Sequence, residues 1–215
     1  KNQDINETLA TAEEIMYSVK TLERESFSEE EIDVIMEMLH ASSPEEKAHS
    51  ETLCELCYKM GKFFALSEVD QRNLKELGYY HDIGKIVLPT ELLGHYREFT
   101  REEMTEIRKH ALVGYRILNS TDRTVNIAEA VLSHHERWDG SGYPMGLKGD
   151  EIPLLSRILA VAERYDRLKG LHGTTPDAET YIKQTLLNEA GSLFDPYVVH
   201  AFLKMLDENS MITKL

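Results

Sequence analysis

The chain has 215 residues, of which 24 are Lys or Arg and 38 are Asp or Glu, so its formal net charge is −14. This balance excludes binding to long nucleic acids or anionic membranes through a broad basic surface. Apolar residues make up 41% of the chain and charged residues 29%, which is an ordinary globular composition. No run of about 18 apolar residues occurs, so we expect no membrane-spanning helix.

The negative charge is concentrated near the N-terminus. Residues 1–51 carry 14 acidic and four basic side chains, whereas residues 52–215 carry 24 and 20. This difference indicates two segments with different roles. The opening KNQDINETLA has neither an initiator Met nor a basic-then-apolar signal region, so we expect a fragment of a longer, cytoplasmic protein.

Helical periodicity dominates the chain, and alternating β-branched runs are almost absent. We therefore predict an all-α fold with one long glycine-rich loop at 139–153. Ser28 with Glu31 and Thr100 with Glu103 have capping-box spacing, and Ser67 is a further expected N-cap. The predicted helices, in chain order, cover residues 6–25, 28–40, 42–66, 67–86, 100–120, 123–138, 154–170, 176–191 and 195–209.

The two cysteines, Cys54 and Cys57, lie three residues apart on a predicted amphipathic helix. A redox or metal-binding CxxC motif would need a βαβ context or a second cysteine pair, and the sequence has neither. We therefore interpret both as small apolar residues on a core face, with reduced thiols.

The placement of the nine histidines carries more information. His81 precedes Asp82 at a predicted helix end, and His134 and His135 form a doublet just before the glycine-rich loop. His49 and His110 lie inside predicted helices. Imidazole mixed with carboxylate suits Fe, Mn or Zn better than Mg or Ca. The remaining histidines are interpreted as surface or structural residues: His40, His95, His172 and His200.

These motifs resemble the HD-GYP family, a branch of the HD-fold metal-dependent phosphohydrolases. HDIGK at 81–85 is followed by HHERWDGSGYP at 134–144, and the similarity extends from about residue 44 to the FDP segment at 194–196. The best-known members hydrolyse cyclic dinucleotides, chiefly cyclic di-GMP. The resemblance implies an HD-fold helical domain over residues 31–215 with additional N- and C-terminal helices, acting in bacterial second-messenger signalling.

The resemblance also implies roles for individual residues. Two divalent ions, or three, would supply the hydroxide that attacks phosphorus, with Fe or Mn favoured and Zn an alternative. Asp82 would bridge two ions and act with Lys85 in catalysis, where Lys85 contacts the scissile phosphate. Gly142, Tyr143 and Pro144 would shape the substrate side, where Tyr143 either stacks on a base or contacts protein. The implied metal ligands are His49, His81, Asp82, His110, His134, His135, Glu163 and, as an extra carboxylate, Glu45.

The sequence departs from the family pattern around the last ligand. Glu163 stands where the family normally has Asp, and the usual Arg-Pro-Tyr stretch is replaced by LKGLHGTTPDAE. Asp166 matches a second family Asp, for which a packing or hydrogen-bonding role is expected. Glu45 is equally well explained as an acidic residue that favours the helix dipole near its N-terminus.

Alternatives to a cyclic dinucleotide phosphodiesterase therefore stay open. One is a catalytically weak sensor that binds metal and nucleotide and acts through partners, and another is an HD phosphohydrolase for a different nucleotide. Upstream, AEEIMYSVK at 12–20 resembles the closing helix of a GGDEF domain, although an ordinary linker helix explains it equally well. Residues 1–30 are accordingly a linker or the tail of an upstream domain, and a homodimer is compatible with the sequence.

Overall fold

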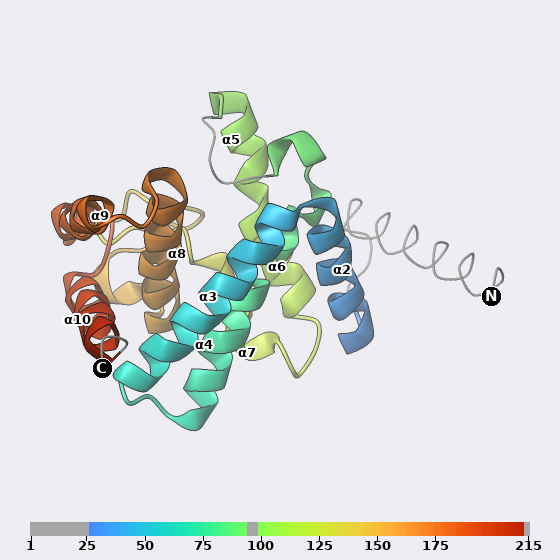
Figure 1. Cartoon of the computed structure of the whole chain (residues 1–215). Coiled ribbons are helices and arrows are strands. Elements are labelled where there is room, and N and C mark those ends of the chain that lie inside the picture. The colour runs from blue at the N-terminus through green and yellow to red at the C-terminus, as the bar shows by residue number, and fades with distance from the viewer. Residues whose placement is uncertain (1–25, 94–98, 213–215) are drawn as a thin grey trace.

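The computed structural model describes residues 26–93 and 99–212 (Figure 1). The helix expected at 6–25 and the GGDEF-like segment lie outside these residues. The described part contains helices and no strand, which confirms the all-α prediction. The elements are α2 (Glu29–Ser42), α3 (Pro44–Phe63), α4 (Glu68–Tyr80), η1 (Ile83–Val87), η2 (Thr90–Leu92), α5 (Arg101–Ile107), α6 (Lys109–Leu118), α7 (Val125–Leu132), η3 (Gly149–Glu151), α8 (Leu154–His172), α9 (Pro176–Glu189) and α10 (Pro196–Ile212).

The expected helix starts are confirmed where polar side chains cap them. The Ser28 Oγ accepts from the Glu31 N–H at 3.3 Å, and the Glu31 carboxylate accepts from the Ser28 N–H at 2.8 Å. Thr100 and Glu103 form the second capping box. Such caps satisfy N–H groups that have no partner inside the helix.

Three predicted helices were too long, because the chain turns where the site is built. The helix expected over 67–86 ends at Tyr80, and a 3₁₀ segment, η1, follows the His81–Asp82 turn. The helix expected over 100–120 divides at Arg108 into α5 and α6, and the one expected over 123–138 ends at Leu132. His81 and Asp82 thus follow the end of α4, and His134 and His135 follow the end of α7.

The core is formed where α3 and α4 pack together and α8 lies against them, while α9 and α10 cover the outer side of α8 (Figure 1). Gly78 of α4 allows the close approach, because a Cβ there would lie 2.5 Å from the carbonyl oxygen of Leu53 on α3. Cys57 is fully buried among apolar residues, which supports the core interpretation for this residue, whereas Cys54 is only partly buried. Both are free thiols.

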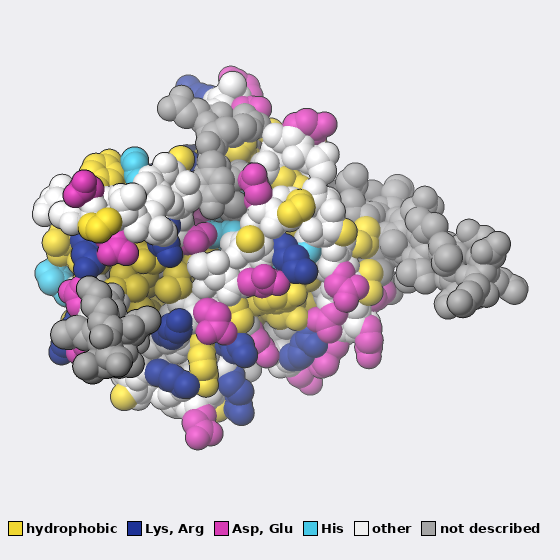
Figure 2. All heavy atoms as spheres, in the orientation of Figure 1, with side chains coloured by type: hydrophobic (Ala, Val, Ile, Leu, Met, Phe, Trp, Pro, Cys, Tyr) yellow, Lys and Arg dark blue, Asp and Glu magenta, His cyan; other side chains and the backbone are white. Residues whose placement is uncertain are grey.

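The charge asymmetry seen in the sequence is visible on the surface. In Figure 2, acidic side chains gather over α2, whose sequence EEEIDVIMEMLHAS supplies five of them. None of the helices in the described part of the chain is long and apolar enough to cross a membrane.

Candidate metal centre

Two groups of metal-binding side chains lie next to each other in the interior. His49 on α3 meets His81 and Asp82, which follow the end of α4; within this group the potential ligand atoms lie within 4.8 Å of one another. His110 at the start of α6 meets His134 and His135, which follow the end of α7, within the same limit. The tertiary structure thus brings together side chains from four helices, and His135 is the most exposed of them.

Three of the histidines are fixed by the carbonyl oxygen three residues earlier. His81 Nδ1 donates to Gly78 O at 3.0 Å, His110 Nδ1 donates to Ile107 O, and His134 Nδ1 donates to Val131 O. A carbonyl oxygen can only accept, so Nδ1 carries the proton in each ring. In the neutral form, Nε2 is therefore left with a free lone pair, as a metal ligand requires.

His49 is oriented by a carboxylate instead of a carbonyl. Its Nδ1 lies 2.7 Å from Oδ2 of Asp166 on α8. The Asp166 side chain is largely buried. Asp166 therefore acts on a site histidine and lies outside both donor groups, in agreement with the hydrogen-bonding role expected for it. A carboxylate partner of this kind fixes the ring orientation and raises the basicity of the other nitrogen.

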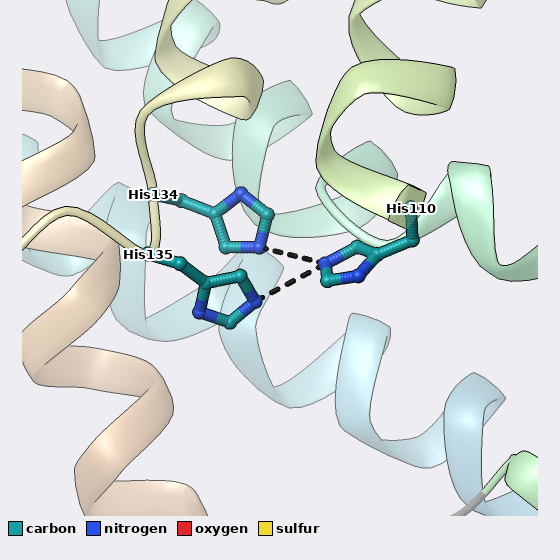
Figure 3. Close-up of side chains that lie close together, drawn as sticks. All are labelled: His110, His134 and His135. Atoms are coloured by element: carbon teal, nitrogen blue, oxygen red, sulfur yellow. Dashed lines mark hydrogen bonds between the residues drawn. The ribbon is translucent and has the colours of Figure 1, made fainter. Parts of the chain in front are cut away.

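The Nε2 atoms of the second group point at one another. His110 Nε2 lies 3.3 Å from His134 Nε2 and 3.1 Å from His135 Nε2 (Figure 3). Because His110 and His134 both carry their protons on Nδ1, their facing Nε2 lone pairs repel each other unless a cation lies between them. The donor set therefore fits a divalent metal ion that prefers imidazole nitrogen.

Asp82 lies between the two groups. Its Oδ2 is 3.1 Å from His81 Nε2 and 4.0 Å from His49 Nε2, whereas its Oδ1 is 3.3 Å from His110 Nε2. Each carboxylate oxygen thus faces a different group, which is the geometry a bridging ligand needs. Burial opposes ionisation of Asp82, but the charges of His81 and Lys85 outweigh it and hold its pKa well below the ordinary value.

Burial also sets the protonation of the second group. It lowers the pKa of His110, and it lowers the pKa values of His134 and His135 well below the ordinary value, with a further contribution from the neighbouring imidazoles. Neutral imidazoles are the form that binds metal.

Lys85 is buried and paired on both sides. Its Nζ lies 2.8 Å from Asp82 Oδ2, and it donates to both carboxylate oxygens of Glu46 at 3.0 and 3.2 Å. Burial opposes the charge on Lys85, but these two carboxylates raise its pKa above the ordinary value. The lysine is thus held as a cation at the edge of the site.

The carboxylate that α3 turns inward is Glu46 and not Glu45. Glu46 is completely buried, whereas Glu45 is exposed and belongs to neither donor group. Glu45 therefore fits its alternative interpretation as an acidic residue in the first turn of α3. The sequence did not single out Glu46, because the positions three and four residues before His49 both share its helix face.

The glycine-rich loop is anchored by Glu136, a second residue that the motif contains but that sequence reasoning left without a role. Its buried carboxylate accepts from the backbone N–H groups of Met145, Gly146 and Leu147 at 2.7, 3.1 and 3.1 Å. Gly142 passes so close that a Cβ would lie 2.3 Å from the backbone nitrogen of Arg137. Hydrogen bonds to Glu136 therefore hold the loop next to the histidine doublet.

The ring of Tyr143 makes a protein contact. It stacks on His135 with ring centroids 4.9 Å apart, and the Arg108 guanidinium lies 4.8 Å from its centroid. Pro144 follows through a cis peptide bond. The loop thus places an aromatic side chain directly on one of the candidate ligands.

A cavity of about 390 Å³ opens beside the histidine doublet. Glu163 lines it from α8 and is half-buried, but it lies outside both donor groups. The cavity is large enough for part of a nucleotide. Its lining includes Met104, Arg108, His134, His135, Glu136, Arg137, Tyr143, Ala160, Glu163, Arg164, Arg167, Leu193 and Phe194.

The fold and the site together define an all-helical protein with a preformed histidine and aspartate centre for metal. A family described as the HD domain matches residues 33–198, and the chain belongs to this family. The relatives below support the predicted placement in its HD-GYP branch. HD-domain phosphohydrolases are metal-dependent, in keeping with the two donor groups.

Characterised relatives are similar over much of the chain. The 3'3'-cGAMP-specific phosphodiesterase 2 of Vibrio cholerae is 33% identical over 173 residues, covering 79% of this chain and 33% of the relative. The cyclic di-GMP phosphodiesterase of Thermotoga maritima is 34% identical over 191 residues, covering 86% and 51%. The chain thus spans between about a third and a half of the length of these relatives.

Solved structures support the fold. A cyclic GMP-AMP-specific phosphodiesterase of Vibrio cholerae superposes with a TM-score of 0.64 at 19% identity, covering 85% of this chain and 48% of the other. An HDG"Y"P protein from Bdellovibrio bacteriovorus gives the same TM-score at 16% identity, covering 94% and 69%. Both show that the helices are arranged as in the HD fold.

Proposed function

We propose that this chain hydrolyses a phosphodiester bond of a cyclic dinucleotide, cyclic di-GMP or 3'3'-cGAMP, to the linear dinucleotide or the mononucleotide. The observation that carries the proposal is Asp82, whose two oxygens face two separate histidine groups beside a 390 Å³ cavity. The names of the relatives above supply the substrate class.

We assign two divalent ions to the centre. One would be held by His49, His81 and Asp82, and the other by His110, His134 and His135 with the second oxygen of Asp82. Glu163 is the remaining candidate ligand, reaching in from the cavity wall. Iron or manganese is favoured, with zinc as the alternative. Bound divalent ions lower the pKa of water and withdraw charge from phosphoryl oxygens.

The surrounding residues prepare the centre for this chemistry. The carbonyl and carboxylate partners of Nδ1 hold the imidazoles in one tautomer before any ligand arrives. Lys85 keeps a positive charge beside Asp82, where charge develops on the phosphate during attack. Tyr143 covers His135 and separates part of the centre from solvent.

A nucleotide sensor without turnover is the competing proposal, and the position of Glu163 is the observation that favours it. Its carboxylate lies outside both donor groups, and it is one methylene longer than the family's Asp. A ligand that does not close the coordination sphere would leave metal and nucleotide binding intact while it slowed hydrolysis.

Metal analysis paired with a turnover assay separates the two. The purified chain should contain about two equivalents of iron or manganese and cleave cyclic di-GMP or 3'3'-cGAMP to linear product. His81→Ala combined with Asp82→Ala should lose both properties, whereas His200→Ala, at an exposed position on α10, should keep them. Two bound metal ions without turnover of either nucleotide would replace the enzyme proposal with the sensor.

The setting of this activity follows from the substrate class. We propose that the chain acts in the cytoplasm and that the segment before residue 31 joins it to an upstream signalling domain, with a GGDEF domain as the specific candidate. The relatives are two to three times longer than the part matched, which leaves room for such domains in them.

A further inference from the structure

Four arginines line the cavity beside the histidine doublet, and one of them, Arg164, is paired with a carboxylate. Arg164 is neutralised by Glu189, to which its Nε donates at 2.9 Å and its Nη2 donates as well. Within the described ranges 26–93 and 99–212, no carboxylate oxygen lies within 4.0 Å of the other three guanidinium groups, those of Arg108, Arg137 and Arg167.

Two elements hold these side chains at the cavity. Ala160, Glu163, Arg164 and Arg167 have the spacing i, i+3, i+4 and i+7, which places them on one face of α8. Arg137 lies directly after Glu136, whose carboxylate fixes the glycine-rich loop. The arginines are thus carried by backbone that is itself held in place.

The charge of the cavity is opposite to that of the whole chain. Its lining contains four arginines and two carboxylates, Glu136 and Glu163, and the Glu136 carboxylate is already occupied by three backbone N–H groups. Arg108, Arg137 and Arg167 are exposed to solvent, and a local excess of guanidinium groups in a chain with a net charge of −14 favours an anionic occupant. Guanidinium groups bind phosphate oxygens in a bidentate, planar geometry.

We propose that Arg137 and Arg167 bind the second phosphate of the cyclic dinucleotide, the one that is not cleaved in the first step. This inference rests on the proposed function, because the scissile phosphate is the one placed at the histidines. Only a nucleotide with two phosphates contacts both the metal centre and the arginines, so this surface selects cyclic dinucleotides over cyclic mononucleotides.

Binding without metal tests the arginines separately from catalysis. Titration calorimetry in the presence of a chelator would measure the binding of cyclic di-GMP to the metal-free protein. The Arg137→Gln, Arg167→Gln double variant should weaken cyclic di-GMP binding about tenfold or more, because hydrogen bonds to charged groups are among the stronger ones. Arg116→Gln, at an exposed arginine outside the cavity lining, is the matched control.

Equal affinity of the wild type and the double variant for cyclic di-GMP would overturn the inference, and so would an equal loss in the Arg116→Gln control. The manganese-loaded protein provides the second comparison, with bis(p-nitrophenyl) phosphate as a substrate that has one phosphate. The double variant should keep this hydrolysis while its KM for cyclic di-GMP rises about tenfold or more. If the wild type cleaves neither substrate, the proposed function fails, whereas the calorimetric difference still decides the role of the arginines.

Discussion

Gly84 of the HDIGK motif is the point where η1 touches α6, and replacing it with Ala should damage fold and site together. A Cβ at this position would lie 2.0 Å from the carbonyl oxygen of His110 and 2.5 Å from the backbone nitrogen of Gly114. Both atoms belong to backbone and cannot rotate away. The first of them belongs to a residue of the candidate metal centre.

The size of the effect follows from these distances. Cβ contacts under 3.0 Å essentially never occur, so η1 and α6 must separate by about 1 Å. Overpacking typically costs about 1–3 kcal/mol, and a clash with backbone favours the upper end, about 3 kcal/mol. In a chain of this size that cost lowers Tm by roughly 6–12 °C. Because His110 Nε2 lies 3.3 Å from Asp82 Oδ1, the same shift should lower hydrolysis about 100-fold.

Thermal unfolding, metal content and turnover of cyclic di-GMP measure the three consequences. Gly114→Ala is the matched control on the opposite side of the contact, because its Cβ would meet the Val131 side chain at 3.0 Å, which can move. We expect that variant to stay within about 1 kcal/mol of wild type. A Gly84→Ala protein with wild-type Tm and full metal content would refute the assignment of Gly84 as a required close contact.

Three further changes probe the supports of the site. Asp166→Ala removes the partner of His49 Nδ1 and should weaken metal binding about 10- to 100-fold, measured by competition with a chelator; partial recovery in Asp166→Asn would confirm the hydrogen bond, and unchanged affinity would contradict it. Glu136→Ala leaves three backbone N–H groups without their acceptor and should cost about 3 kcal/mol, with faster hydrogen exchange at residues 145–147; protected amides there would contradict this role. The pKa of Asp33 is lowered by its hydrogen bonds with Arg123, so its stabilising effect is present near neutral pH and is lost as pH falls through the folded-state pKa. The Tm difference between wild type and Asp33→Asn should therefore be largest near pH 7, correspond to about 1 kcal/mol or less for this partly exposed pair, and shrink towards pH 3; a constant difference would exclude this linkage.

Helix starts and the helical class could be read locally from the sequence. Ser28 and Thr100 cap the helices for which their spacing predicted a start, because capping depends on residues three positions apart. Helix ends could not be read in this way. The helical spacing of apolar residues continues through His81 and Arg108, yet α4 ends at Tyr80 and α6 begins at Lys109. Both boundaries lie where η1 packs on α6, a contact between residues far apart in the sequence.

The same distinction applies to the site. Adjacent side chains such as His81 with Asp82 and His134 with His135 mark a metal centre in the sequence, because few other roles need such doublets. The sequence does not show whether Glu45 or Glu46 points into the site, since both are glutamates in the same helical turn. Only the position of Lys85, buried against α3, decides that Glu46 is the one turned inward.

The sequence by itself determined the helical class, the order of the motifs, and the histidines and aspartate able to bind metal. The tertiary structure decided which oxygen of Asp82 faces which histidine group, and it placed Tyr143 on His135. It also gathered arginines from the junction of α5 and α6, the segment after α7, and α8 around one cavity of a strongly acidic chain. The reason is physical: residue type and short spacing set local chemistry, whereas side-chain direction and local electric field depend on how distant helices pack.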